Sequence, residues 1–312
     1  MTVLRPAIYI PHHRGAERLA RTLRSLAEQS RPVDVVVADN GSSDASAELV
    51  HEQFPDVTLL ELGGNLGFGR AINRAVAEHP GDPAILLNDD VDCDPHFVEA
   101  MLDAAAEGAD AVAGVLVQEA DPRLIDSAGV VADRTLMGFD YLHGEPLEAA
   151  ETAADPLGPT GGAALYRLDA FRAAGGFDER IFLYYEDLDL TLRLAAGGGR
   201  CRLAPGARAI HAYSASSGAA SAFKYSHTGW SRAYMLRRYG VMSRPGTALR
   251  ALAAEAAICA GQLAIDRTAA GIGGRLRGWR DAGGLARRDA GDAPLLDISL
   301  REALHLRRRR RA

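Results

Sequence analysis

The sequence has few of the features that mark secreted, disulfide-bonded or membrane-spanning proteins. It contains three cysteines in 312 residues, an odd number without metal-binding spacing, which favours reduced thiols over a disulfide framework. Its longest apolar stretch, residues 251–265, is too short to span a bilayer and is interrupted by Glu255. No basic segment with an apolar core precedes the first strand pattern, so we expect no signal peptide. These absences predict a cytoplasmic chain without a transmembrane helix.

Charge is distributed unevenly along the chain. Residues 223–312 hold 18 of the 35 Lys and Arg but 7 of the 41 Asp and Glu, and they end in five arginines at positions 307–311. We therefore predict two parts with different roles, residues 1–225 and a basic C-terminal region of residues 226–312. Each basic side chain near an anionic lipid surface contributes about 1 kcal/mol, so we expect this region to bind the inner face of the cell membrane peripherally. A helical packing or dimerisation element is the alternative for this region, and a solvated, disordered tail is the alternative for the arginine run.

Short β-rich runs alternate with amphipathic helical patterns in the first part of the chain. Strands are predicted at residues 7–10, 33–38, 57–62, 84–87, 111–117, 201–203 and 207–210. In the first helix between them, Leu19, Leu23 and Leu26 fall on one face at helical spacing. The alternation predicts an α/β fold with a mostly parallel sheet flanked by helices. Residues 119–159 are weakly patterned and are expected to form loops or short strands around a site. Beyond Trp230 the pattern is almost wholly helical.

An acidic cluster follows the fourth predicted strand directly. Asp90 and Asp92 would project from the carboxyl end of a parallel sheet, the edge at which ligands bind in open α/β folds. Two neighbouring carboxylates repel each other unless a hard cation neutralises them, and Mg²⁺ prefers one or two carboxylates plus substrate phosphates. Asp89 adds a third acid, so the pair that holds the metal is left open. A polar turn that caps the next helix is the alternative interpretation.

Further polar residues stand at the ends of other predicted elements. Asp39 follows the second strand, where it could bind a base or ribose, or cap the next helix. The glycine-rich loop at residues 63–69 precedes a helix, as phosphate-binding loops do, but it follows the third strand, which excludes a dinucleotide fingerprint.

Asp187 begins a helix and is interpreted as a general base or as an acid that stabilises the helix start. His211 ends a strand, a position that permits metal coordination or a structural role.

Together and in this order, these segments resemble the inverting nucleotide-sugar transferases of glycosyltransferase family 2. The matching stretches are residues 36–44, 65–69 with Asn73, 86–92, 175–179, 184–190 and the strand ending at His211. They lie within residues 7–239, and the stretch Ser127-Ala128-Gly129 is similar to one in bacterial rhamnosyltransferase-like members. The first loop departs from the family, because it has His12 and His13 where a Tyr-Asn type of pair is usual.

The resemblance implies a GT-A fold with a nucleotide-binding half, an acceptor-binding half and a helical C-terminal extension. It makes Asp187 the catalytic base and Mg²⁺ or Mn²⁺ the cofactor. The donor-binding residues that it implies are Pro11, Asp39, Asn65, Gly67, Arg70 and Asp90. The implied metal ligands are Asp90, Asp92 and His211, and the implied acceptor-binding residues are Gly161, Gly162 and Glu186.

The implied activity is metal-dependent transfer of a sugar, with rhamnose favoured, from a dTDP- or UDP-linked donor to a polyprenyl-linked cell-envelope glycan. Nucleic acid is not an expected partner. A sugar nucleotidyltransferase is the alternative enzyme, but His13-Arg14-Gly15 is a poor version of the triphosphate-binding loop that it requires. The alternative without catalysis is a nucleotide-sugar-binding subunit of a glycan assembly complex. The acidic residues and His211 argue against it.

Overall fold

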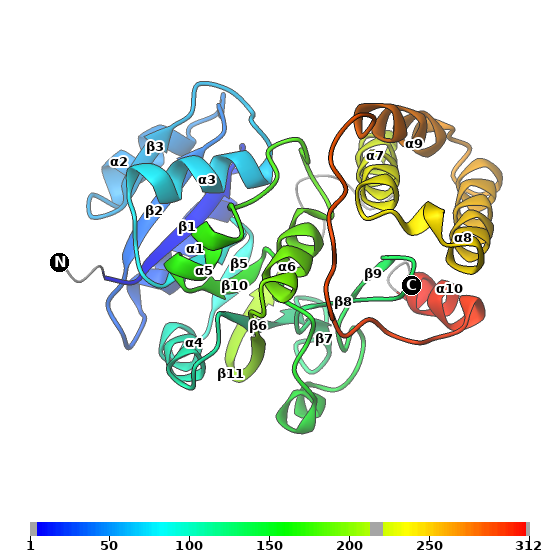
Figure 1. The fold of residues 1–312 in the computed structure, drawn as a ribbon. Helices are drawn as coiled ribbons and strands as arrows, with labels where there is room; N and C mark the ends of the chain where they lie inside the picture. Colours follow the sequence, from blue (N-terminus) through cyan, green and yellow to red (C-terminus); the bar gives the residue numbers. More distant parts are fainter. Residues whose placement is uncertain (1–4, 213–220, 310–312) are drawn as a thin grey trace.

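A nine-stranded sheet lies at the centre of the computed structural model, which describes residues 5–212 and 221–309 (Figure 1). The strand order is β3-β2-β1-β4-β10-β6-β11-β5, and β7 pairs with β6. The strands are β1 (Ala7–His12), β2 (Asp34–Asp39), β3 (Thr58–Glu61), β4 (Ala84–Leu87), β5 (Val91–Cys93), β6 (Ala111–Gln118), β7 (Ile125–Ser127), β10 (Ala163–Tyr166) and β11 (Cys201–His211). Strands β1 to β4, β6 and β11 run in one direction and β5, β7 and β10 in the other. The expected α/β fold with a mostly parallel sheet is confirmed.

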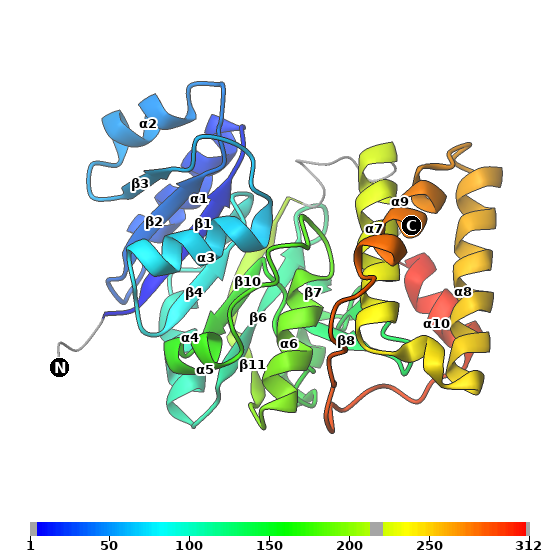
Figure 2. The same ribbon diagram turned by 45° about the horizontal axis from the view of Figure 1, so that its top comes forward.

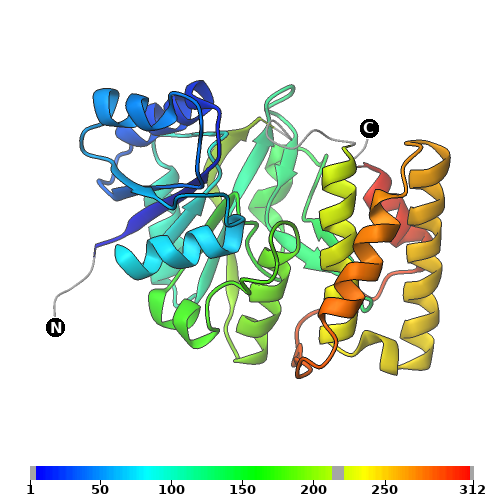
Figure 3. The ribbon, with the colours of Figure 1, turned by 90° about the horizontal axis from the view of Figure 1, so that it is seen from above.

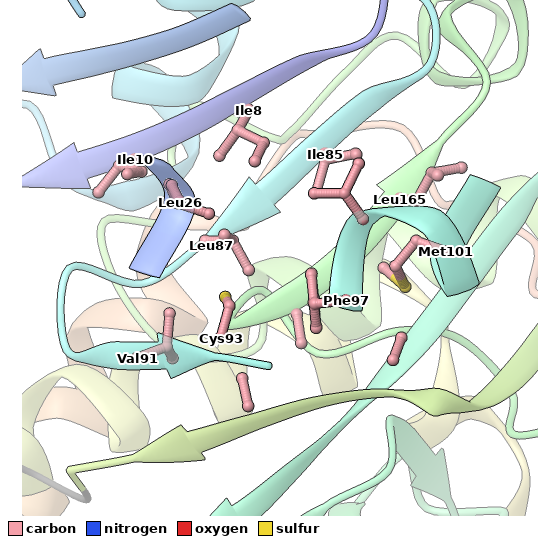
Figure 4. Packing of buried hydrophobic residues seen from close by; sticks show 14 of the residues in the cluster. Ile8, Ile10, Leu26, Ile85, Leu87, Val91, Cys93, Phe97, Met101 and Leu165 are labelled. Carbon is pink, nitrogen blue, oxygen red and sulfur yellow. The ribbon is translucent and has the colours of Figure 1, made fainter. Parts of the chain in front are cut away.

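Helices cover both faces of this sheet. Those that contribute to the core on one face are α1 (Ala16–Ala27), α2 (Ser46–Gln53) and α4 (Phe97–Ala106), and those on the other are α3 (Phe68–Glu78), α5 (Leu168–Ala173) and α6 (Glu186–Ala196) (Figure 3). Because side chains alternate along a strand, Ile8 and Ile10 enter the first core (Figure 4) while Tyr9 enters the second. Burial on both faces explains why the strand is a continuous apolar run rather than an alternating one.

Three details differ from the sequence-based expectations. Residues 91–93, for which no strand was expected, form strand β5 on the edge of the sheet. The two strands expected at residues 201–203 and 207–210 are one strand, β11, whose pairing with β6 shifts between Leu203 and Arg208. Its sequence contains Pro205 and Gly206 at that shift, which breaks the pattern where the strand bends. Helix α5 was not expected.

The weakly patterned segment at residues 119–159 forms short elements, as expected. Besides β7, they are β8 (Val130–Ala132), β9 (Gly138–Asp140) and the 3-10 helix η1 (Leu147–Thr152). Strands β8 and β9 make a separate antiparallel pair. This hairpin lies between the central sheet and the C-terminal helices (Figure 1).

The C-terminal region is helical and packs on the rest of the protein. Its elements are α7 (Ala222–Arg238), η2 (Val241–Ser243), α8 (Pro245–Ala264), α9 (Ala270–Asp281) and α10 (Leu300–Arg309) (Figure 2). One hydrophobic cluster joins Leu188 of α6 to Tyr234 of α7. The buried Arg232 pairs with Glu255 at 2.7 Å and donates a hydrogen bond to the carbonyl of Thr135. No described helix has the length and apolar character needed to cross a membrane.

The predicted division at residue 225 stays a prediction. Helix α7 begins before this residue, and the two predicted parts share the hydrophobic cluster that contains Leu188 and Tyr234. Of the arginine run at 307–311, Arg310 and Arg311 lie outside the described residues.

Helices α7 and α9 approach closely through glycines. A Cβ atom on Gly278 would lie 2.0 Å from the carbonyl oxygen of Trp230, and one on Gly274 would lie 2.1 Å from that of Ser226. Backbone atoms cannot move aside as a flexible side chain can, so the two helices pack this closely only because α9 has glycine at these positions.

We predict that Gly278→Ala lowers the free energy of unfolding by about 1–3 kcal/mol, because the added methyl forces α9 away from α7. Gly273→Ala on the same helix is the matched control, since its Cβ would meet only the Arg277 guanidinium at 3.4 Å. Alanine there should be neutral or stabilising by up to about 1 kcal/mol. Urea unfolding of both variants measures the difference, and equal effects would contradict the packing argument.

Candidate active site

The predicted site residues gather at the edge of the sheet where the parallel strands end. Strands β1 and β2 end in register at His12 and Asp39. Strand β10 runs the opposite way and starts beside Leu87, the last residue of β4, so the preceding Gly161 and Gly162 lie at the same edge. The structure therefore brings the predicted base-binding residue and the predicted acceptor loop to one side of the sheet.

Asp39 is held in a turn rather than at the start of a helix. Its Oδ1 accepts hydrogen bonds from the backbone amide of Ser42 at 3.0 Å and from the Ser42 hydroxyl. Helix α2 begins after Ala45 without a side-chain cap. Pro11, opposite Ala38 in the register, is half-buried beside it. The alternative that Asp39 caps α2 is wrong, and its role in base binding stays a prediction.

The glycine-rich loop is fixed to the Asp39 turn through Asn40. The Asn40 side chain accepts from the Leu66 amide at 3.1 Å and donates to the Gly67 carbonyl at 3.4 Å, while Asn65 Oδ1 accepts from the Gly67 amide. Gly67 has φ of 85°, and a Cβ there would lie 2.4 Å from the Phe182 carbonyl oxygen. Only glycine permits this close approach. The loop thus connects the Asp39 turn to the segment that leads into α6.

Arg70 and the predicted acceptor loop lie beside this loop. The Arg70 Nε is 3.2 Å from Glu179 Oε2, and both side chains are about half exposed, so this pair contributes little stability. Gly161 packs against the ring of Phe68, and Gly162 against the side chain of Asn88. Because its pair with Glu179 contributes little stability, Arg70 can leave Glu179 and bind a ligand at a small cost in free energy.

Asp89 has structural partners inside the protein. Its Oδ2 lies 2.5 Å from Nδ1 of the buried His12 and 3.3 Å from the Arg18 guanidinium. The second imidazole nitrogen of His12 is 2.8 Å from the Ser46 hydroxyl. His12, at which this chain departs from the family pattern, is thus the partner of Asp89, the additional acid of the cluster. Because Asp89 is engaged in this way, Asp90 is the better candidate for a metal ligand.

Asp90 faces His211, as the predicted metal site requires. His211 Nε2 is 3.4 Å from Asp90 Oδ1, and His211 Nδ1 is 2.6 Å from Asp126 Oδ2. Burial lowers the pKa of His211, but the hydrogen bond to Asp126 and the charge of Asp90 outweigh it and raise that pKa to about 10. His143 contacts the carbonyl of Asp126 at 2.7 Å. Asp92 lies in β5 opposite Ile210, and no hydrogen bond or ion pair in the described part of the chain joins it to this group.

The Asp90–His211 pair can hold a divalent cation if the cation displaces the proton that the raised pKa of His211 retains. Across residues 5–212 and 221–309, no three His, Cys, Asp or Glu side chains are grouped to hold a metal ion. Asp90 Oδ1, however, is buried and accepts no hydrogen bond within the same residues. The contact of Asp126 with His211 Nδ1 is typical of a metal-binding histidine. Two protein ligands suffice where substrate phosphates and waters supply the others.

Helix α6 begins with two acids after a strained turn. Tyr184 and Tyr185 have φ of 68° and 70°, a left-handed conformation that costs about 1–3 kcal/mol per residue. Burial, followed by the nearby charge of Asp187, raises the pKa of Glu186 well above its ordinary value, and Glu186 Oε2 has no hydrogen-bond partner among the described residues. Asp187 is half-buried, and its Oδ1 accepts from the Leu188 amide at 2.7 Å. The roles predicted for both acids stay predictions.

Two features of the site escaped the sequence. Asp126 stands 85 residues before His211 and was not singled out, although the next three residues were part of the family resemblance. The contact between His12 and Asp89 spans 77 residues. A pattern of neighbouring residues contains no signal for such contacts.

Comparison with known proteins points to glycosyl transfer. The family model "Glycosyl transferase family 2" matches residues 7–174. An N-acetylglucosaminyl-diphospho-decaprenol L-rhamnosyltransferase from Mycobacterium tuberculosis is 34% identical over 238 residues, which cover 68% of this chain and 76% of the relative. These similarities favour glycosyl transfer over the alternative of a sugar nucleotidyltransferase.

Solved structures agree on the fold. The mannosyltransferase PcManGT from Pyrobaculum calidifontis, in complex with GDP-Man and Mn²⁺, has a TM-score of 0.54 at 18% identity, covering 90% of this chain and 86% of that one. GalNAc-T7, with UDP, GalNAc and Mn²⁺, has a TM-score of 0.59 at 14% identity, covering 91% of this chain and 55% of that one. Both are glycosyltransferases of the GT-A type, so the expected GT-A fold is confirmed.

We predict that Asp89→Asn and Asp90→Asn have different effects. Asp89→Asn should lower the free energy of unfolding by about 1–3 kcal/mol, because the buried His12 loses its charged partner. Asp90→Asn should cost less stability, since Asp90 Oδ1 accepts no hydrogen bond, but it should weaken Mn²⁺-dependent nucleotide binding. Thermal unfolding and calorimetric titration separate the two effects. Loss of metal dependence in Asp89→Asn alone would reverse the assignment.

Stability should also depend on pH through Glu186. Its raised pKa means that the folded protein holds a proton that the unfolded chain releases above the ordinary value of 4.5. The stability that this proton contributes is present below that pH and is lost as the pH rises. Glu186→Gln should therefore raise Tm at pH 8 and have a smaller effect at pH 5. The same gain at both pH values would show that the carboxyl group is not protonated in the fold.

Proposed function

This chain belongs to glycosyl transferase family 2, and we propose that it transfers L-rhamnose from a nucleoside diphosphate donor to N-acetylglucosaminyl-diphospho-polyprenol. The observation that carries this proposal is the 34% identity to the mycobacterial L-rhamnosyltransferase, which extends over 68% of the chain. Among the possible donors we favour the dTDP-linked sugar over the UDP-linked one. The anomeric carbon is inverted in a single displacement.

In this mechanism Asp187 is the general base. It accepts the proton of an acceptor hydroxyl while that oxygen forms a bond to the anomeric carbon, and the bond from this carbon to the donor diphosphate breaks on the opposite face. The position of Asp187 in the first turn of α6 supports this role, because a helix start after a strained turn holds the carboxylate in a defined place. Burial favours the neutral form of Glu186, so the two neighbouring acids need not both carry charge.

The donor would bind along the edge formed by β1, β2 and β4. We assign Asp39 to the nucleobase, the loop with Asn65 and Gly67 to the donor, and Arg70 to its phosphates, where the guanidinium can leave Glu179. Asp90 and His211 would hold a divalent cation, which when bound stabilises the negative charge that develops on the leaving diphosphate. Asp126 fixes the orientation of His211 through the contact with Nδ1.

We also propose that the C-terminal helices bind an anionic membrane, where a polyprenyl-linked acceptor is anchored. In the part of the chain that the structure describes, every large hydrophobic side chain that is exposed lies between the start of α7 and the end of α9: Phe223, Leu249, Leu252, Leu263, Ile265, Leu276 and Trp279. Exposed arginines accompany them, including Arg244, Arg267, Arg277 and Arg280. Apolar side chains among basic ones are typical of surfaces that insert into the headgroup layer.

Rhamnosyl transfer is tested first with Asp187→Asn. We expect kcat to fall by about 10²–10⁴-fold, because the amide cannot accept the proton, while the donor nucleotide binds with unchanged affinity. Asp169→Asn, a charge removal at an exposed position in the first turn of α5, is the matched control. Loss of nucleotide binding together with activity in Asp187→Asn would contradict the assignment of the base.

The donor is identified by calorimetric titration of the wild-type chain with dTDP, UDP and GDP, each with and without Mn²⁺. We expect Mn²⁺-dependent binding of dTDP, followed by transfer from dTDP-rhamnose to an N-acetylglucosaminyl-diphospho-lipid. If only UDP binds, the transferred sugar is one that UDP carries rather than rhamnose. If no sugar linked to dTDP, UDP or GDP is transferred, the alternative of a non-catalytic subunit is favoured.

Membrane binding is tested with vesicles that contain phosphatidylglycerol. The double variant Ile265→Asp and Leu276→Asp should weaken co-sedimentation by at least about tenfold, since two apolar side chains would no longer be buried in lipid. Arg74→Asp on the exposed face of α3 is the control for added negative charge. Equal binding of the double variant and the wild type would exclude this surface.

A further inference from the structure

A segment of the C-terminal region lies along the helix that carries the proposed base. Residues 282–299, which we name the strap, connect α9 to α10 and run beside α6 in both views (Figures 1 and 2). A Cβ on Gly291 of the strap would lie 2.8 Å from the Cα of Ala196, at the end of α6. Further along, the Leu296 amide donates to the Ala132 carbonyl at 2.8 Å. The strap is thus held against both α6 and β8.

Arg288 of the strap joins two buried carboxylates on either side of the strained turn. Its Nη1 is 2.8 Å from Asp178 Oδ2, in the loop before the turn, and 2.6 Å from Asp189 Oδ1, in the first turn of α6. Asp178 is 6% exposed and Asp189 is fully buried. Asp187 lies between these two contacts along the chain. One guanidinium therefore ties together both ends of the segment that presents the proposed base.

Helix α7 and the residue after it contribute to the same group. The Tyr234 hydroxyl donates to Asp178 Oδ2 at 2.6 Å, and the Tyr239 hydroxyl donates to Asp189 Oδ1 at 2.9 Å. Arg193 of α6 also pairs with Asp189, at 2.8 Å. The Arg288 backbone amide donates to the Arg238 carbonyl at 2.7 Å, which fixes the strap to the end of α7.

We propose that Arg288 is a positioning residue for glycosyl transfer, which sets the start of α6 and so the place of the Asp187 carboxylate. This inference rests on the proposed function. The left-handed conformation of Tyr184 and Tyr185 is unfavourable by itself and persists only where the surrounding contacts determine it. Without Arg288, the two buried carboxylates lose the cation that they share, and the segment between them loses its restraint. The C-terminal region then acts in catalysis as well as in packing.

The test compares Arg288→Met with Arg287→Met, the same substitution at the adjacent, exposed residue. For Arg288→Met we expect kcat to fall roughly 10- to 100-fold, as for a misplaced catalytic group, while the donor KM stays within about twofold of wild type. Arg288→Lys should recover part of the kcat, because it restores the charge. Wild-type kcat in a folded Arg288→Met protein, or an equal loss in Arg287→Met, would overturn the proposal.

Hydrogen–deuterium exchange gives a readout that does not depend on turnover. Peptides that cover residues 178–196 should exchange faster in Arg288→Met and stay unchanged in Arg287→Met, even if the wild type transfers no sugar to the acceptor tested. This result separates failure of the proposed positioning role of Arg288 from failure of the proposed function. If Arg288→Met does not fold, Tyr239→Phe, which removes one hydrogen bond to Asp189, should show the same change to a smaller degree. Unchanged exchange and kcat in both Tyr239→Phe and Arg288→Lys would overturn the proposal.

Discussion

Several carboxylates of this chain are removed from water, and each of them requires a cation or hydrogen-bond donors from a distant part of the sequence. Asp89 has His12 and Arg18 from the first strand and helix, and Asp126 has two histidines. Asp189 has Arg288, 99 residues further along the chain. These contacts tie the loops at the edge of the sheet to one another, and the C-terminal helices to α6. The arrangement of the site depends on this compensation of buried charge.

Asp90 differs from these acids in how its charge is compensated, because His211 forms an ion pair with it at 3.4 Å without a hydrogen bond. Its Oδ1 is buried without a hydrogen bond in the described residues, beside an imidazole whose other nitrogen is already engaged. We propose that this oxygen and the imidazole hold a divalent cation, which would stabilise the charge that develops on a leaving diphosphate.

The sequence predicted the features that depend on local pattern. Continuous apolar runs indicated buried strands, because β1 has cores on both sides, and helical spacing of leucines indicated α1. It did not predict β5, since three residues give no period, or the single strand β11, because Pro205 and Gly206 interrupt its pattern at the register shift. The acidic motifs indicated the candidate site, whose residue roles stay predictions. The partners of those acids, Asp126 and Arg288 among them, are set by tertiary contacts that no local pattern encodes.

The strap has a consequence for how the protein matures on the ribosome. The sheet, its flanking helices and Asp187 all precede residue 212, so the nucleotide-binding half can form while the rest is still being synthesised. Arg288 emerges much later and closes the contacts of Asp178 and Asp189 only then. If Arg288 positions the proposed base, a nascent chain whose sheet has folded would still lack that restraint. Synthesis of the strap would then be the event that switches on the proposed transfer.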